Sequence, residues 1–295
     1  MTLSAAELLA LSETDVTVRL TPEQFIPALS QDPFVNIEGT FNARDIGKLP
    51  ETTVRPGFVF RSGMLARLTD KGKATLADDL GVRRIFDFRS QSEHAQAPDP
   101  QPSDKVTLVW QDTAEATPHV SLEPFAEGFG EAGFAQTYMD VLRAYRPTVK
   151  QLLEHVRDRP DEPFLFHCTA GRDRTGVLGG LLLTLAGASH DTVALDYMLS
   201  RIGSEPVRDE LEKFARMGAG VPTRKADDSP EAIATAIAAT PPGFLNLINL
   251  RVVCWNYFLA ELEKEHGGFE GYVTKTLGFS DADVATIKKN LTTAP

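Results

Sequence analysis

The stretch of sequence that decides the fold is Pro163-Phe-Leu-Phe-His-Cys-Thr-Ala-Gly-Arg-Asp-Arg-Thr-Gly176. Its first four residues form a short apolar run, which is typical of a buried strand. A tight loop from His167 to Arg174 follows, and an apolar helix is expected to start near Thr175. A strand, a loop and a helix in this order indicate an α/β protein.

Helices and strands are also predicted on both sides of this stretch. Apolar residues at helical spacing over 68–80 precede Gly81 and a predicted strand that starts at Arg84. Residues 134–158 have helical periodicity, and Pro147 is expected to kink or split that helix. Further predicted strands lie within 54–61 and over 106–110, residues 112–130 are expected to form a loop, and the chain after 175 is expected to be helical with an interruption at 217–230.

These elements predict an α/β fold with a central, mostly parallel sheet flanked by helices and a helical C-terminal part. No stretch has the composition of a linker between separate cores, so residues 1–295 are expected to form a single domain. The 295 residues are 42% hydrophobic and 24% charged, as in ordinary globular proteins. The sequence lacks the basic start of a signal peptide and a run long enough to span a bilayer, which predicts a cytoplasmic protein without membrane insertion.

The net charge of −11 argues against a surface that grips nucleic acid or an anionic membrane. It leaves room for a small basic pocket that binds one anionic group. The two cysteines, Cys168 and Cys254, cannot form a disulfide framework, and they fit a reducing compartment. Cys254 lies in an apolar helical pattern and is expected to be a core residue.

The loop itself has the residues that cysteine-dependent hydrolysis of a phosphate monoester requires. Cys168 is the predicted nucleophile, and the curled backbone and the positive end of the following helix favour its thiolate and bind the phosphate oxygens. Arg174 offers a planar fork that matches two phosphate oxygens. Gly171 permits a backbone conformation that a side chain would hinder. Thr175 can donate its hydroxyl to the sulfur of Cys168.

The remaining loop residues are predicted to bind substrate or to organise the loop. A cysteine before an apolar helix is usually a core residue, but Gly171, Arg174 and Thr175 at these spacings outweigh that interpretation here. His167 is expected to orient the loop through backbone hydrogen bonds. The predicted substrate-binding residues are His167, Thr169, Ala170, Gly171, Arg172 and Arg174, with no metal or cofactor.

Asp173 is the candidate acid that protonates the leaving oxygen and later activates water. Arg172 and Arg174 on either side favour its carboxylate, whereas a bound phosphate dianion opposes this effect. An acidic pH optimum follows, and a flat profile of kcat/KM from about pH 5 to 8 would contradict the assignment. Asp87 and Asp112 are the alternative acids if Asp173 points away from the leaving group.

The signature loop resembles that of the Cys-x5-Arg protein tyrosine phosphatases, and most closely that of their PtpB-like, triple-specificity class. Further similar blocks begin at Asn42, Phe60, Leu68, Ile85 and Gly267, so the resemblance covers about residues 35–291. It implies that Asp173 is the general acid. It also implies a helical lid, expected within about residues 205–250.

The resemblance implies a phosphatase that acts on phosphotyrosine, with phosphoserine, phosphothreonine and phosphoinositides as further substrates of the class. Arg172 stands where the class usually has Lys, and Thr169 is neutral where phosphoinositide phosphatases have a basic residue, so lipids are not favoured. The alternatives are a phosphoinositide phosphatase, a phosphate-binding module without activity, and arsenate reduction or sulfur transfer. Arsenate reduction would need Cys254 as resolving thiol. The expected partner is therefore a phosphoprotein or a small phosphomonoester.

Overall fold

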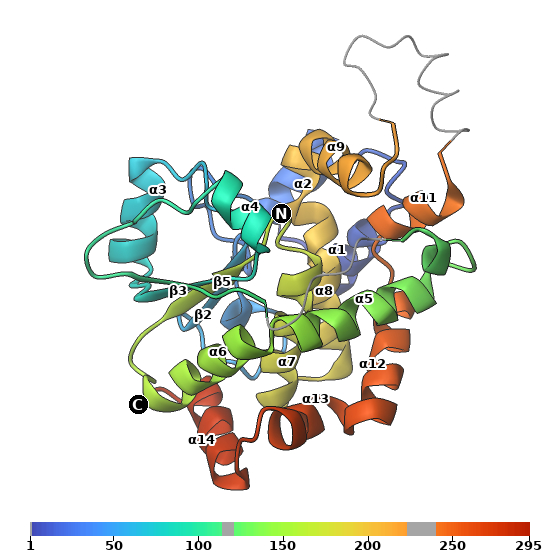
Figure 1. The fold of residues 1–295 in the computed structure, drawn as a ribbon. Helices are drawn as coiled ribbons and strands as arrows, with labels where there is room; N and C mark the ends of the chain where they lie inside the picture. Colours follow the sequence, from blue (N-terminus) through green and yellow to red (C-terminus); the bar gives the residue numbers. More distant parts are fainter. Residues whose placement is uncertain (1, 114–120, 223–239) are drawn as a thin grey trace.

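The computed structural model describes residues 2–113, 121–222 and 240–295. At its centre is a five-stranded sheet in the order β1-β2-β5-β3-β4 (Figure 1). Strands β2, β5, β3 and β4 are parallel, and β1 pairs antiparallel with β2. The predicted α/β class with a mostly parallel sheet is thus confirmed. The strands are β1 (Arg44–Asp45), β2 (Val59–Ser62), β3 (Arg84–Asp87), β4 (Thr107–Trp110) and β5 (Phe164–His167).

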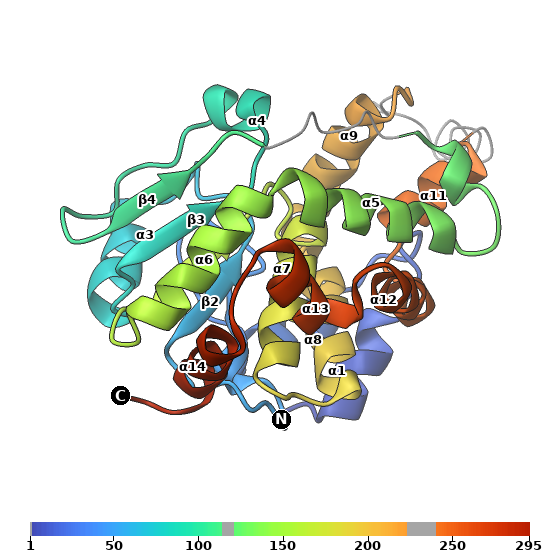
Figure 2. The same ribbon diagram turned by 60° about the horizontal axis from the view of Figure 1, so that its bottom comes forward.

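Helices cover both faces of the sheet and form a large helical part beside it (Figures 1 and 2). In the helical part α5 packs against α12, and α8 packs against α7 and α1. The helices are α1 (Ala5–Ser12), α2 (Pro22–Leu29), α3 (Asp70–Ala74), α4 (Gln91–Gln96), α5 (Glu131–Ala144), α6 (Arg146–Asp158), α7 (Asp173–Leu185), α8 (His190–Gly203), α9 (Arg208–Gly218), α11 (Pro242–Ile248), α12 (Val252–His266), α13 (Gly268–Gly271) and α14 (Asp281–Thr292).

The strand before the signature loop is buried on both faces. Phe164 and Phe166 pack into the larger hydrophobic core, which they share with residues of α5, α6, α7 and α8. Leu165, which points to the opposite face, packs into a smaller core with Leu76 and Ile85. Alternate side chains of a strand point to opposite faces, so a parallel strand covered on both sides needs a continuous apolar run. This is why residues 163–166 could be interpreted as a buried strand.

Three details correct or extend the predicted elements. The helix predicted over 134–158 is split into α5 and α6 at Tyr145, and Pro147 lies in the first turn of α6. The helix expected near Thr175 starts two residues earlier, at Asp173. The predicted interruption at 217–230 begins where α9 ends, and its part from 223 onward lies outside the described residues. In the part of the chain that the structure describes, no helix is long and apolar enough to span a membrane.

Candidate active site

The signature loop connects the carboxyl end of β5 to the first turn of α7. Strand β5 lies between β2 and β3, so the loop emerges in the middle of the sheet. Ligands of parallel α/β sheets bind at this edge, beyond the carboxyl ends of the strands. The side chain of Arg172, the residue before α7, makes no capping hydrogen bond. The start of α7 is therefore suited to bind an anion with its backbone amides.

Cys168 lies at the base of the loop and is 2% exposed. The hydroxyl of Thr175 donates a hydrogen bond to its Sγ over 3.1 Å, as the sequence predicted. Gly171 has φ +65°, and a Cβ at this position would lie 2.4 Å from the carbonyl oxygen of Ser62. The prediction that Gly171 adopts a conformation closed to other residues is confirmed, because both the left-handed φ and the close approach require glycine.

A buried charged network supports the loop from below. The carbonyl oxygen of Gly171 accepts hydrogen bonds of 2.9 Å from Asn42 Nδ2 and from Arg61. Asp196 of α8 forms ion pairs with Arg61 and with Arg44, whose Nε lies 2.8 Å from Asp196 Oδ1. All of these groups are 3% exposed or less. Buried charges of this kind require partners, and together they fix the loop relative to β1, β2 and α8.

Arg174 is held by a carboxylate from α4. Its two terminal nitrogens lie 2.6 and 2.8 Å from the two oxygens of Glu93, a bidentate pair. Glu93 also accepts a hydrogen bond from Thr169 Oγ1 in the loop. Burial alone would raise the pKa of Glu93, but the hydrogen bonds and charge of Arg174 outweigh it and hold that pKa well below its usual range. Glu93 is therefore ionised and fixes the plane of the Arg174 guanidinium.

Asp173 is held on the other side of the loop by hydroxyl and guanidinium groups. Its Oδ1 accepts a 2.9 Å hydrogen bond from the hydroxyl of Tyr138 on α5. Its Oδ2 lies 3.0 Å from Nε of Arg172. The two terminal nitrogens of Arg172 donate to the carbonyl oxygens of Ile248 and Leu247 at the end of α11. Each of the three side-chain nitrogens of Arg172 thus donates a hydrogen bond to a protein atom, and two of these bonds connect the loop to α11.

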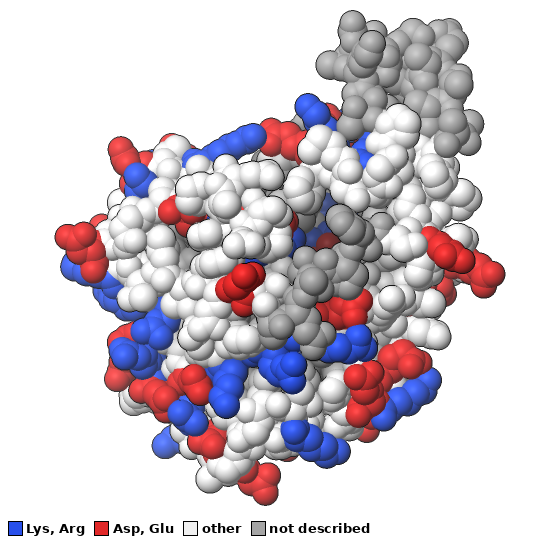
Figure 3. All heavy atoms as spheres, viewed as in Figure 1, with Lys and Arg blue, Asp and Glu red and all other residues white. Residues whose placement is uncertain are grey.

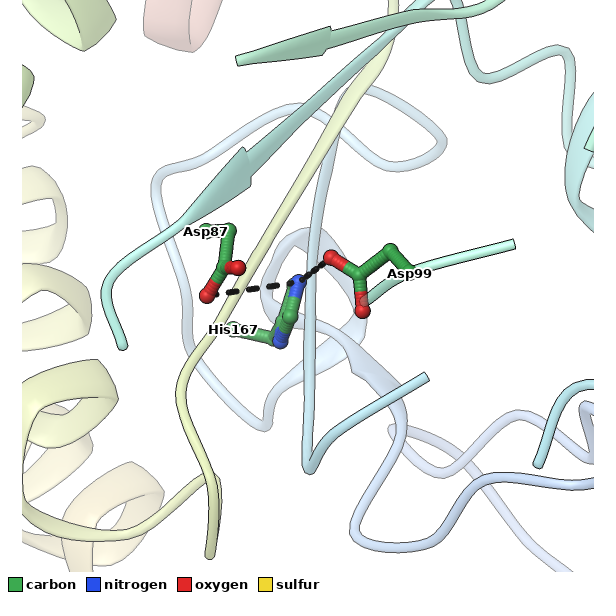
Figure 4. A group of neighbouring side chains, drawn as sticks. All are labelled: Asp87, Asp99 and His167. Atoms are coloured by element: carbon green, nitrogen blue, oxygen red, sulfur yellow. Dashed lines mark hydrogen bonds and ion pairs between the residues drawn. The ribbon is translucent and has the colours of Figure 1, made fainter. Parts of the chain in front are cut away.

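His167 lies between two carboxylates at the end of β5 (Figure 4). Its Nε2 is 2.8 Å from Asp99 Oδ2 and 4.0 Å from Asp87 Oδ1, and its Nδ1 is 3.3 Å from the carbonyl oxygen of Cys168. Burial would lower the pKa of His167, but the charge and hydrogen bond of Asp99, with Asp87, raise it. The interaction with the Cys168 carbonyl agrees with the predicted role of His167 as a loop organiser.

The same cluster has the ligand types of a metal site, but a guanidinium already supplies the positive charge there. One nitrogen of Arg89 lies 2.8 Å from Asp87 Oδ2 and 2.9 Å from Asp99 Oδ1. Burial opposes ionisation of Asp87, yet His167, Arg89 and His94 lower its pKa to about 2. The donor set is therefore an ionic network between the sheet and the segment that follows α4, and it does not favour a metal ion.

Two cavities meet above the loop. The first is lined by Cys168 and Thr169 together with residues of α8, α9 and α11, and the second lies against α5 and the start of α4. Both are lined by Asp173, Arg174 and Phe214 of α9. Around them, on the face in Figure 3, acidic and basic side chains of the described residues are interspersed. Cys168, Asp173 and Arg174, the predicted nucleophile, acid and anion-binding residue, therefore share one cavity.

The other candidates from the sequence lie elsewhere. Asp87 is buried in the ionic network, and Asp112 is exposed beyond β4. Cys254 is buried on α12 and donates to the carbonyl oxygen of Phe129, which confirms the prediction of a core residue. Burial raises the pKa of its thiol to about 12. Cys254 is therefore a poor candidate for a resolving thiol.

Several residues around the site were not singled out by the sequence. Tyr138 is one apolar position of the helical pattern over 134–158, and Glu93 lies in the similar block that begins at Ile85. Asp99 lies in a segment rich in Pro and Gln that offered no signal. Ser90 and Glu93 form a capping box, which could have indicated the start of α4. It could not have indicated the bond from Glu93 to Arg174, 81 residues further on.

The fold and the loop define the class of cysteine-dependent phosphatases that use a Cys-x5-Arg loop. A model of the tyrosine phosphatase family matches residues 35–293, and the chain belongs to this family. It is 30% identical over 231 residues to a tyrosine-protein phosphatase of Nostoc commune, covering 78% of this chain and 73% of that protein. It is 28% identical over 276 residues to the triple specificity protein phosphatase PtpB of Mycobacterium tuberculosis, covering 84% and 95%. The resemblance found from the motifs is thus confirmed.

Proposed function

We propose that this enzyme hydrolyses phosphotyrosine in proteins through a cysteinyl-phosphate intermediate. The thiolate of Cys168 attacks phosphorus, and the bond to the tyrosine oxygen breaks as Asp173 gives that oxygen its proton. Asp173, now a carboxylate, takes a proton from the water that attacks the cysteinyl phosphate, which releases inorganic phosphate and the thiolate. The loop amides and Arg174 bind the three equatorial oxygens throughout.

One observation supports this proposal above the others. Cys168, Asp173 and Arg174 line a single cavity at the start of α7, and the sulfur of Cys168 accepts the hydroxyl of Thr175. The oxygens of the phosphate that is transferred to Cys168 can therefore lie against the loop while the tyrosine oxygen, the leaving group, reaches Asp173. A phosphate-binding module without activity would not need the acid or the hydrogen bond to the sulfur.

The pairing of Arg172 supports a phosphotyrosine substrate over a phosphoinositide. A phosphoinositide presents several phosphates, and its recognition needs further basic groups at the rim of the loop. Here Arg172 donates to Asp173 and to two carbonyl oxygens of the α11 segment, and Thr169 donates to Glu93. We also propose that residues 1–295 act as one catalytic domain, without nucleic-acid partners, and that α9 and α11, which lie within the predicted 205–250 region, cover the site as a lid.

The experiment compares two cysteine variants on a phosphotyrosyl peptide, a phosphoseryl peptide and a soluble inositol phosphate. Cys168→Ser should abolish phosphate release from every substrate, while Cys254→Ala, which removes the other buried thiol, should retain turnover. The phosphotyrosyl peptide should be the preferred substrate, vanadate should compete with it, and EDTA should leave the rate unchanged. Turnover by Cys168→Ser would overturn the mechanism, and preference for the inositol phosphate would overturn the substrate class.

A further inference from the structure

Two buried tyrosines stand in series behind the predicted acid. The hydroxyl of Tyr138 lies 2.9 Å from Asp173 Oδ1 and 2.7 Å from the hydroxyl of Tyr197 on α8. Both tyrosines are 1% exposed or less. Asp173 itself lines both cavities, and its side chain is 29% exposed. The chain of hydroxyls therefore runs from the helical core to a carboxyl group at the surface of the site.

The direction of these hydrogen bonds follows from the number of protons. A phenol has one proton, and the proton of Tyr138 is donated to the carboxylate of Asp173. Tyr197 must then donate to the oxygen of Tyr138. Burial and the charge of Asp173 raise the pKa of both phenols well above their usual value. Both hydroxyls therefore remain protonated donors over the whole pH range in which such an enzyme works.

The two rings cannot easily move away from Asp173. Tyr138 packs edge-on against Phe258, with ring centroids 5.3 Å apart, and Tyr197 stacks on Trp255 at 4.7 Å. These contacts come from α12, which packs along α5. A hydroxyl on a fixed ring holds its acceptor in one place more firmly than a water molecule would.

From this arrangement we infer that Tyr138, backed by Tyr197, is a positioning residue that holds the Asp173 carboxyl for proton transfer. This inference rests on the proposed role of Asp173. Tyr138 anchors Oδ1, and Oδ2, which lies 3.0 Å from Nε of Arg172, keeps a lone pair for the proton that passes to the leaving group. A neutral donor is suited to this task because it does not hold the carboxylate as strongly as a second cation would.

Other groups also face Asp173, and they remain in place when the hydroxyl of Tyr138 is removed. The loss of a donor to the carboxylate favours the protonated acid, since a hydrogen bond to the charged form is lost. The descending limb of the profile of kcat/KM against pH should therefore move upward in a variant without this hydroxyl. The charged and titratable groups that line the two cavities with Asp173 are Cys168, Arg172, Arg174, Arg201, Glu205, Arg208 and Glu212 in the first and Glu93, Asp140, Tyr145 and Arg174 in the second. Tyr197 lies behind Tyr138, and Cys254 of α12 lies behind Tyr197.

The test compares Tyr138→Phe with Tyr272→Phe in the full chain. Tyr272 is an equally buried tyrosine that donates to the carbonyl oxygen of Leu142, away from Asp173. The profile of kcat/KM against pH is measured with phenyl phosphate, which needs an acid, and with p-nitrophenyl phosphate, whose leaving group needs it less. We expect Tyr138→Phe to move the descending limb for phenyl phosphate upward by about 1 pH unit and to lower its plateau several-fold. Tyr272→Phe should leave both unchanged.

A double variant distinguishes positioning from a merely structural role. In an Asp173→Asn background Tyr138→Phe should cause no further loss with phenyl phosphate, because the group that it positions is already absent. If Tyr138→Phe does not fold, Tyr197→Phe should show a smaller shift of the same sign. A folded Tyr138→Phe with the pH profile of Tyr272→Phe would overturn the inference and leave the role of Asp173 intact. A descending limb that persists in Asp173→Asn would overturn the proposed acid, and the inference with it.

Discussion

The two sides of the signature loop are supported in different ways. On one side Arg174 is fixed by the full negative charge of Glu93, through two short hydrogen bonds. On the other side Asp173 is fixed by the neutral hydroxyl of Tyr138 and by Arg172, which is shared with the carbonyl oxygens at the end of α11. Glu93 and Tyr138 come from elements far away in the sequence, whereas Arg172 directly precedes Asp173 in the loop.

This difference follows from what each group must do. In the proposed mechanism Arg174 binds phosphate as a cation at every step, and the carboxylate of Glu93 beside it fixes the plane of its guanidinium. In the same proposed mechanism Asp173 loses and regains a proton in each cycle, so the groups that hold it must tolerate both of its forms. A phenol can donate a hydrogen bond to a carboxylate, and it can also donate to the carbonyl oxygen of the protonated acid. The cation Arg174 is therefore held by a carboxylate, whereas one oxygen of Asp173 is held by a neutral donor and the other by Arg172.

The largest effect that tests this comparison is expected on the side of the loop that holds Asp173. Asp173→Asn keeps the size of the side chain and its contact with Tyr138 but removes the transferable proton. The kcat for phenyl phosphate should fall by roughly 10²–10⁴-fold, the usual contribution of a positioned acid, and that for p-nitrophenyl phosphate should fall less. Steady-state kinetics with both substrates measures the difference. Asp112→Asn, at an exposed position, is the matched control and should behave like the unchanged enzyme. Equal losses for the two substrates would contradict the acid role.

A smaller loss is expected on the arginine side. Glu93→Gln removes the charge that fixes Arg174 while one carbonyl oxygen remains, so the guanidinium should lose its orientation. We expect kcat/KM to fall by about 10–10²-fold for all substrates, whatever their leaving group. Glu162→Gln, which removes a more exposed carboxylate paired with Arg159, should have little effect. A loss that depends on the leaving group would mean that Glu93 acts on proton transfer to the leaving group and not on the orientation of Arg174.

The same variant has a defined pH dependence of stability. The pKa of Glu93 is lowered on folding from its ordinary value of 4.5, so its contribution to the free energy of unfolding is present above that pH and is lost as the pH falls toward its value in the folded protein. Urea denaturation should show Glu93→Gln less stable by roughly 1–3 kcal/mol at neutral pH. The difference should shrink below pH 4.5. A difference that does not depend on pH would mean that the charge of Glu93 is not involved.

The smallest effect is expected at His167. Its pKa is raised above 6.5 on folding, mainly by Asp99 against the effect of burial, so this stabilisation is present below pH 6.5 and is lost as the pH rises through the pKa of the folded state. Asp99→Asn should therefore destabilise the protein more at about pH 5.5 than at about pH 8.5, in unfolding experiments at matched salt. Its kcat should fall only a few-fold, since Asp99 acts through His167. The opposite trend with pH would contradict the raised pKa.

Local features of the fold and site could be predicted from the sequence. The strand before Cys168, the loop, the strands around it and the split of the helix at Pro147 follow from apolar patterns and from glycine and proline. The hydrogen bond from Thr175 to Cys168 spans seven residues and could be predicted as well. Short helices were harder to predict from the sequence. Helices α1 and α2 have eight residues each, and their clearest signals are the capping boxes at Ser4 and Thr21.

The supports of the loop could not be predicted, because they depend on how distant elements pack. Glu93 meets Arg174, and Tyr138 meets Asp173, across separations of 81 and 35 residues. In the sequence Tyr138 has the pattern of a core residue, which it also is, and nothing marks its hydroxyl as facing an acid. Arg172 was predicted to bind substrate from its place in the loop, and its bonds to the α11 segment depend on a chain crossing that no local pattern encodes.

Trapping the cysteinyl-phosphate intermediate would show whether Cys168 carries the phosphate during the reaction. The enzyme is mixed rapidly with a phosphotyrosyl peptide, denatured in acid within the first turnover and digested for mass spectrometry. We expect one phosphate adduct on the peptide that contains Cys168, and none in the Cys168→Ser variant. An adduct on another residue, or release of the dephosphorylated peptide in the first turnover without any adduct on Cys168, would contradict the role of Cys168 as nucleophile.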